Sequence, residues 1–248
     1  MKLIRFLRVI SASFTATNEP STNKNMQKTL LTISTFAATA MLFSFCGNNA
    51  TNQPSTANDS TSNEVTIDKQ VWMSKNLNVD KFRNGDLVPE AKTAGEWKAY
   101  ADAGEAAWCY SDNYASNGTK YGKLYNWYAV NDPRGLAPKG WHVPSDEEWT
   151  VLTDYLGGAE RAGAKMKAKT DWLSDGNGTN SSGFSGLPGG YRSSNGTFDY
   201  IGLYGFWWSS TENYADGAWG RTLNYFNGNV NRDGSIKEDG LSVRCLRD

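Results

Sequence analysis

The sequence predicts an α+β fold, a single domain with two or three helices, short antiparallel strands and long loops. Three observations lead to this class. From Val65 onward, dense apolar residues are separated by turns rich in Gly, Asn, Asp and Ser. Two capping boxes each mark the start of a helix. No unit recurs at a fixed period, which excludes a solenoid or propeller. Residues 65–248 therefore form one domain of about 184 residues.

Composition narrows the function classes. The 248 residues have a net charge of -1 and 39% hydrophobic residues, which excludes collagen, a coiled coil and a polytopic membrane protein. After residue 64 there are 20 Lys and Arg against 23 Asp and Glu, so no basic surface for nucleic acid is expected. The chain has 10 Trp, 12 Tyr and 10 Phe, enough to build an aromatic contact surface.

The N-terminal segment is typical of an exported lipoprotein. A basic flank at Lys24–Lys28 precedes an apolar run to Phe45, and the run is too short for a comfortable membrane span. We expect residues 26–46 to be a signal peptide, with Cys46 acylated as an anchor in the outer membrane or at the cell surface. An ordinary cleaved signal, or a buried segment with an apolar Cys46, are the alternatives. Residues 1–25 are interpreted as an extension from a misassigned start, and the alternative is that Met1–Arg5 is itself a weak signal.

Residues 47–64 contain no large apolar residue and cannot bury enough surface to order themselves, so they are predicted to be a disordered tether. The domain then begins with strands over 65–67 and 70–73, joined by a turn at Asp68-Lys69. Helices are expected after Thr93 and after Ser145, where Glu follows three residues later, and a third over 159–169. Further short strands are expected at 122–130, 205–210, 221–226 and 241–246.

Five motifs in order resemble one known family. They are the string from Tyr121 to Tyr128, then 138–149 (PKGWHVPSDEEW), 183–192 (GFSGLPGGYR), 207–212 (WWSSTE) and 242–245 (SVRC). The chain resembles the Fibrobacter succinogenes major paralogous domain, common in exported lipoproteins. The resemblance implies a C-type-lectin-like fold, close to the formylglycine-generating enzymes, but no assigned activity. Ala137 departs from the family, in which many members have Cys at this position.

The C-terminal stretch also resembles the variable region of diversity-generating retroelement targets, in which adenine-rich codons such as those of Asn are randomised. Tyr and Trp beside Asn and Arg give contact area and adaptable hydrogen bonds, as in antibody paratopes. The alternative is that these residues only fill a loop-rich domain. The candidate ligand-binding residues are Tyr204, Trp208, Asn213, Tyr214, Asp216, Trp219, Arg221, Asn224, Tyr225, Asn227, Asn229, Asn231 and Arg232. Because neighbouring residues of a strand point to opposite faces, one of Trp207 and Trp208 is expected at the surface.

Other candidate sites are weaker. Cys109 and Cys245 could form a disulfide bond in an oxidising compartment or remain separate buried thiols, and neither has the context of a catalytic cysteine. His142 is the only histidine, which excludes zinc sites built on several His, and a structural role is expected for it. Residues 171–180 are rich in oxygen ligands but fail the EF-hand pattern, so a solvated loop is favoured.

The sequence therefore predicts a non-catalytic module that binds a glycan or protein ligand through its C-terminal aromatic and Asn-rich loops. No catalytic residue, metal or cofactor is expected. A formylglycine-generating type of oxidase and a structural or adhesive surface protein are the two alternatives.

Overall fold

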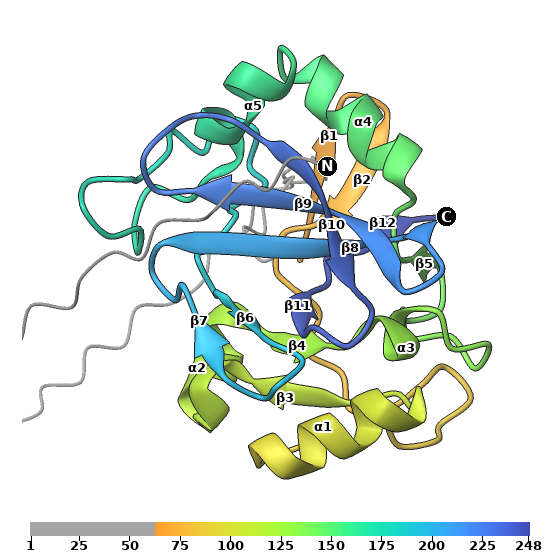
Figure 1. Ribbon diagram of the computed structural model, residues 1–248. Helices are drawn as coiled ribbons and strands as arrows, with labels where there is room; N and C mark the ends of the chain where they lie inside the picture. Colours follow the sequence, from red (N-terminus) through yellow and green to blue (C-terminus); the bar gives the residue numbers. More distant parts are fainter. Residues whose placement is uncertain (1–62) are drawn as a thin grey trace, which may run out of the picture. The chain divides into compact units, whose positions relative to one another are not determined.

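The computed structural model describes residues 63–248 (Figure 1). The predictions for residues 1–62, including the signal peptide, Cys46 and nearly all of the tether, lie outside the described residues. The domain has five α-helices and twelve strands within this range, which confirms the α+β class. The number of helices is larger than the two or three expected because two short helices, over 115–121 and 127–130, were not predicted.

A four-stranded sheet joins the two ends of the domain. Its order is β1-β2-β12-β5, formed by Glu64–Ile67, Gln70–Met73, Leu246–Arg247 and Trp141–His142. The β1–β2 hairpin is the one predicted, and Asp68 in its turn has a positive φ of 54°. Leu246 pairs with Trp72 on one side and with His142 on the other. The C-terminal strand β12 is therefore interior to this sheet.

A six-stranded sheet forms the centre of the domain, in the order β10-β9-β8-β11-β4-β3. Its long members are β8 and β9, which form an antiparallel hairpin interrupted by a bulge. The bounds are β3 Trp108–Tyr110, β4 Lys123–Tyr125, β8 Tyr204–Tyr214, β9 Gly217–Asn224, β10 Asn231–Ile236 and β11 Leu241–Ser242. Strands β6 (Tyr191–Arg192) and β7 (Phe198–Asp199) form a separate two-stranded sheet, and Arg192 bridges to Gly240 beside β11.

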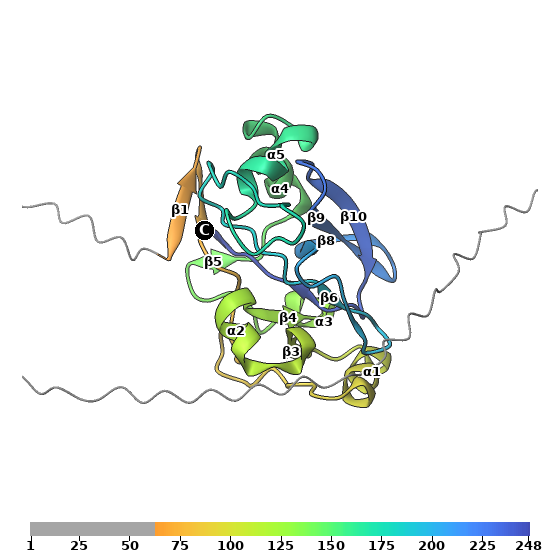
Figure 2. The ribbon, with the colours of Figure 1, turned by 90° about the vertical axis from the view of Figure 1, so that its left-hand side faces the viewer.

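The five helices are α1 Ala94–Ala103, α2 Ala115–Tyr121, α3 Trp127–Val130, α4 Asp146–Tyr155 and α5 Ala159–Met166, with a 3-10 turn at Ser111–Asn113. Both predicted capping boxes are present: Thr93 accepts from Glu96 N, and Ser145 from Glu148 N. Figure 2 shows α4 and α5 at the end of the domain opposite α1. None of the helices in residues 63–248 has the length and hydropathy needed to cross a bilayer.

The strand predicted over 122–130 is wrong in its second half. The strand ends at Tyr125, and α3 begins at Trp127, because Asn126 caps the helix by accepting from Ala129 N. The same side chain accepts from Ala107 N at 3.0 Å and donates to Glu105 O at 2.7 Å. One buried amide thus ends the strand and starts the helix.

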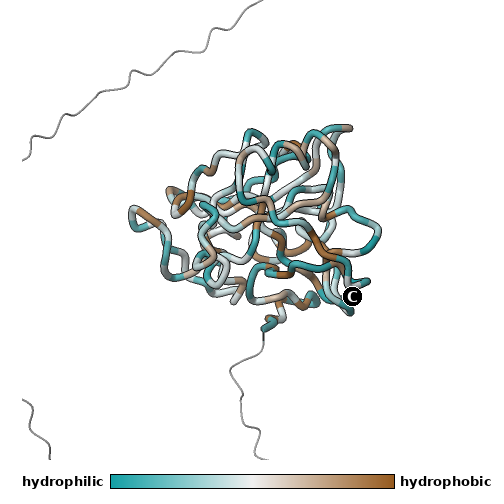
Figure 3. The backbone as a smooth tube through the Cα atoms, turned by 90° about the horizontal axis from the view of Figure 1, so that it is seen from below, coloured by the Kyte–Doolittle hydropathy of each residue, from teal (hydrophilic) through white to brown (hydrophobic). Residues whose placement is uncertain are grey.

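Two hydrophobic clusters lie on opposite faces of β8. Trp208 packs in the first with Trp108, Tyr125 and Trp127, and Trp207 packs in the second with Trp72, Trp149 and others. Both side chains are 0% exposed, so the expectation that one of them reaches the surface is wrong. The alternation of faces was correct, but helix α4 covers the second face (Figure 2). Along the backbone, hydrophobic and hydrophilic stretches alternate (Figure 3).

Candidate binding surface

Six aromatic rings form a continuous cluster at one end of the β8–β9 hairpin, and we call it the aromatic surface. The rings of Tyr204 and Phe206 stack with their centroids 5.7 Å apart and an angle of 11° between their planes. The rings of Tyr191 and Tyr200 stack with their centroids 6.0 Å apart and an interplanar angle of 14°. Tyr200 is 50% exposed and Phe226 61% exposed, while the other four are partly buried. The members are Tyr191, Tyr200, Tyr204, Phe206, Tyr225 and Phe226.

The local sequence explains why these rings meet. Tyr204 and Phe206 are two residues apart in β8 and so share a face. Tyr200 precedes the strand with a positive φ of 65°, a conformation uncommon for an aromatic residue, and its carbonyl accepts from Leu203 N and Tyr204 N. This turn packs on Gly190, where a Cβ would lie 2.4 Å from Asp199 O. A glycine is therefore required before Tyr191.

The aromatic surface also offers hydrogen-bonding groups. None of the hydroxyls of Tyr191, Tyr200, Tyr204 and Tyr225 bonds to another residue within 63–248. Burial raises the pKa of Tyr191, and the carboxylates of Asp239 and Asp199 raise it further. Its hydroxyl is thus protonated at neutral pH and available as a donor. Flat ring faces with free hydroxyls at their edges can hold a ligand that has both an apolar face and polar substituents.

Three of the predicted ligand-binding residues are buried, which corrects the prediction for them. Trp208 is a core residue whose Nε1 donates to Tyr125 O at 2.8 Å. Arg221 lies beneath α4, where its Nη1 donates to Asp146 Oδ1 at 2.7 Å. Asn224 is enclosed at the end of β9. All three are committed to holding the fold together and do not reach a ligand.

The Asn-rich loop after β9 is shaped by its own side chains. Asn224 Oδ1 accepts from Asn227 N at 3.0 Å, and Asn227 Oδ1 accepts from Asn229 N at 2.9 Å. Such bonds form turns locally and explain a run of Asn without any ligand. The Lys167 ammonium donates to the carbonyls of Asn224 and Asn227. Within this segment, Tyr225 and Phe226 are the side chains that join the aromatic surface.

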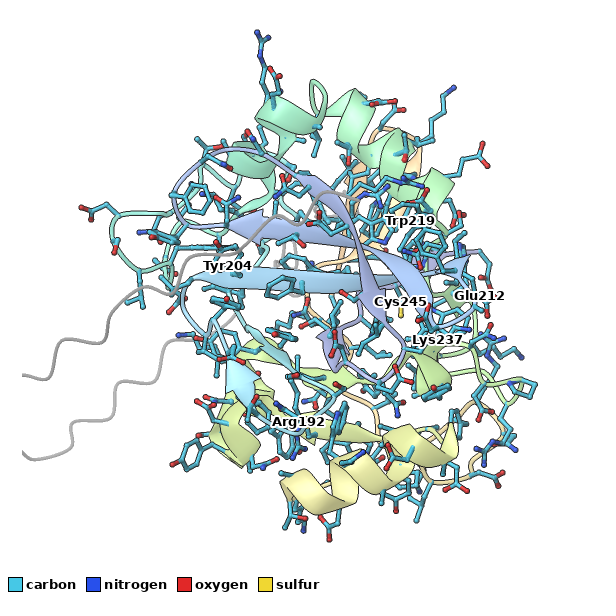
Figure 4. The ribbon with its side chains drawn as sticks, viewed as in Figure 1. Arg192, Tyr204, Glu212, Trp219, Lys237 and Cys245 are labelled. Atoms are coloured by element: carbon cyan, nitrogen blue, oxygen red, sulfur yellow. The ribbon has the colours of Figure 1, made fainter. Side chains whose placement is uncertain are left out.

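Of the other predicted residues, Asn213, Tyr214, Asp216 and Trp219 lie toward the far end of the hairpin. Asn231 and Arg232 lie in β10, where they pair with Thr222 and Arg221 partway along β9. Arg232 lies 3.3 Å from the ring centre of Trp219 and binds Asp146 through Nε and Nη2. Asn213 packs over Gly234, whereas Tyr214 (73% exposed), Asp216 and Asn231 are exposed. Tyr204 and Tyr214 are ten residues apart on one strand, roughly 33 Å. Tyr204 and Trp219 accordingly lie toward opposite ends in Figure 4, and a small ligand cannot touch both.

Sequence reasoning missed four members of the aromatic surface: Tyr191, Tyr200, Phe206 and Phe226. Two signals could have indicated them. Tyr191 follows the double glycine of the 183–192 motif, and Phe206 shares a strand face with Tyr204. Tyr200 could not be placed from sequence because its contact with Tyr191 depends on the β6–β7 turn.

Both cysteines of the domain are free, buried thiols, and they lie in different hydrophobic clusters. The disulfide considered for Cys109 and Cys245 is therefore not formed in this structure. Burial raises the pKa of each thiol to about 12, despite the nearby guanidinium groups of Arg192 and Arg244. Neither is a nucleophilic thiolate at neutral pH.

His142 is held between two carboxylates. Its Nδ1 lies 2.9 Å from Asp248 Oδ1, and its Nε2 lies 3.0 Å from Glu148 Oε1. Burial lowers the pKa of His142, but the two carboxylates outweigh this and raise it above its usual value. A cavity of about 670 Å³ adjoins this residue, with Val130, Leu136 and Val143 among its lining. With both ring nitrogens engaged, His142 is structural and not a free base.

The loop at 171–180 shows no arrangement for a cation. Asp171 pairs with Lys120 at 2.6 Å, and Asn177 Oδ1 accepts from Trp172 N. Among residues 63–248 no group of three or more His, Cys, Asp or Glu side chains could hold a metal ion.

Comparison with protein families matches residues 65–247 to the Fibrobacter succinogenes major domain. The match covers most of the chain, so the chain belongs to this family. No curated protein matches the sequence.

Proposed function

We propose that this chain is a non-catalytic binding module that holds a glycan on its aromatic surface. The observation that supports this is the contact of six rings in one cluster, with Tyr200 and Phe226 half or more exposed. A contiguous aromatic cluster that is partly exposed to solvent is typical of an interaction surface. Flat ring faces gain dispersion contact with the apolar face of a sugar ring, and the tyrosine hydroxyls can bond to sugar hydroxyls.

The test is retention of the chain on arrayed neutral and acidic oligosaccharides, followed by titration of any bound sugar. Tyr200→Ala and Phe226→Ala should each weaken binding about tenfold, because each removes one face of the platform. Tyr155→Ala is the matched control, since Tyr155 is 57% exposed on α4 and outside the cluster. Tyr214→Ala changes an exposed ring at the other end of the hairpin and should leave glycan binding unchanged.

Two outcomes would overturn the proposal. Binding lost in Tyr214→Ala but retained in Tyr200→Ala would move the site to the hairpin tip. If the chain retains no glycan but captures a protein ligand, a protein receptor is favoured. If it retains no glycan and its adhesion is unaffected by the ring replacements, a structural surface protein is favoured.

We also propose that the module is an exported lipoprotein held at the outer membrane or cell surface through Cys46. The basic and apolar pattern before Cys46-Gly47 supports this. Mass spectrometry of the mature N-terminus should find an acylated Cys46, and Cys46→Ala should release the protein from membranes. An unmodified Cys46 would contradict it.

The oxidase alternative is less well supported because it needs a reactive thiol. With both thiols buried and their pKa near 12, copper-dependent oxidation of a peptide cysteine is not expected. Such activity, lost in Cys109→Ala or Cys245→Ala, would reverse this conclusion.

A further inference from the structure

Among residues 63–248, no carboxylate pairs with the buried guanidinium of Arg244. Its Nε and Nη2 donate to Asn76 Oδ1 at 3.0 and 2.7 Å, and its Nη1 donates to Met73 O and Phe184 O at 3.1 and 2.5 Å. The Phe184 ring lies 4.3 Å from the guanidinium carbon. These acceptors are all neutral, and only 1% of Arg244 is exposed.

An enclosed charge without a counter-ion is costly. Burial lowers the pKa of Arg244 to about 9, which still leaves the group charged at neutral pH. A guanidinium has five N–H donors, and four are used by the contacts above. The remaining N–H is on Nη2.

Arg244 lines a cavity of about 290 Å³ whose other polar walls are also suited to an anion. Its lining includes Lys75 and Lys120, which carry ammonium groups, and Ser74 and Thr119, which carry hydroxyls. No carboxylate lines this cavity. The nearby acids are Asp171, which pairs with Lys120, and Glu64, which pairs with Arg247 and lines the neighbouring cavity beside Lys75. The walls therefore carry an excess of positive charge.

We propose that this cavity binds a small tetrahedral oxyanion, a sulfate or phosphate group, free or as an ester. The free N–H of Arg244 and the ammonium of Lys75 supply charge-assisted hydrogen bonds, which are stronger than neutral ones. Hydroxyls of Ser74 and Thr119 come from separate segments of the chain, a three-dimensional donor set that suits a tetrahedral group better than a planar carboxylate. This site is independent of the aromatic surface.

The experiment is isothermal titration of the full chain with inorganic sulfate, phosphate and acetate at constant ionic strength and pH 7. Sulfate or phosphate should bind saturably, and acetate at least fivefold more weakly. Lys75→Gln should weaken binding of the oxyanion about five- to tenfold. Lys69→Gln is the matched control, an exposed lysine that lines none of the cavities described, and it should bind as the parent does.

A charge reversal separates loss of the site from loss of the fold. Lys75→Glu places a carboxylate at the cavity, which should abolish oxyanion binding while circular dichroism and the unfolding midpoint stay at or above the parent values. The proposal is overturned if neither anion binds saturably, if Lys75→Gln and Lys69→Gln bind alike, or if acetate binds as tightly as sulfate and phosphate.

Discussion

Replacing Asp146 by Asn should destabilise the domain by leaving a buried arginine without its counter-ion. Asp146 Oδ1 accepts from Arg221 Nη1 at 2.7 Å, and its Oδ2 accepts from Arg232 Nη2 at 2.9 Å. The Arg221 side chain is 3% exposed and the Asp146 side chain 17%. Breaking a buried pair costs about 3–5 kcal/mol, and the partial exposure of Asp146 reduces our expectation to about 2–3 kcal/mol.

Urea unfolding at pH 7 and pH 2.5 measures this loss. Burial raises the pKa of Asp146, but the bonds to Arg232 and Arg221 outweigh it and hold the pKa below 3.8. The stabilisation by Asp146 is therefore present above pH 3.8 and is lost as pH falls through the lowered value. The difference between parent and Asp146→Asn should shrink in acid.

Two further variants complete this experiment. Asp154→Asn removes an exposed carboxylate from the same helix and should cost less than about 0.5 kcal/mol. Adding Arg221→Met to Asp146→Asn removes the unpaired buried charge and should restore part of the stability. The reasoning is refuted if Asp146→Asn costs no more than Asp154→Asn at pH 7, or if its cost is the same at pH 2.5.

Three other predictions concern stability. Burial raises the pKa of Asp239 from 3.8 to about 6, so the ionised carboxylate destabilises the fold increasingly as pH rises through that range. In urea unfolding, Asp239→Asn should stabilise the domain by roughly 2 kcal/mol at pH 8 and by much less at pH 4, and an equal effect at both pH values would contradict this. Gly190→Ala should lose about 2 kcal/mol or more, measured as a lower thermal midpoint, because the new Cβ meets Asp199 O; an unchanged midpoint would contradict the packing. His142 has a raised pKa, so its stabilisation is complete below pH 6.5 and declines at higher pH; His142→Gln should cost more at pH 5.5 than at pH 8.5, and equal costs would exclude this ion pairing.

The parts of the fold that were predictable from sequence depend on local chemistry. The starts of α1 and α4 were predicted because a capping box closes within four residues. The β1–β2 hairpin followed from its short turn. Strand β10 was missed because its sequence, Asn231–Ile236, is polar, as an exposed edge strand allows.

The candidate site was predicted only in part because the same residue types, Arg and Asn, occur both at contact surfaces and in hydrogen bonds that hold the fold together. Arg221 and Asn224 have the composition of a contact surface, but long-range partners hold them inside, at Asp146 of α4 and beneath the loop after β9. Residue identity alone does not distinguish an arginine that meets a ligand from one that meets a distant helix. Tyr204 and Tyr225 were predicted as contact residues and are partly exposed, but the rings that surround them were not predicted.

The interior position of β12 limits the order in which the domain can fold. Leu246 fills the gap between β2 and β5, and β11 likewise lies between β8 and β4. Neither sheet can be completed before the last strands are synthesised, because β12 pairs with β2 and β5 and β11 pairs with β4, which come much earlier in the chain. Both sheets are therefore completed only when the final residues of the domain are available, so the domain cannot finish folding in order from its N-terminus.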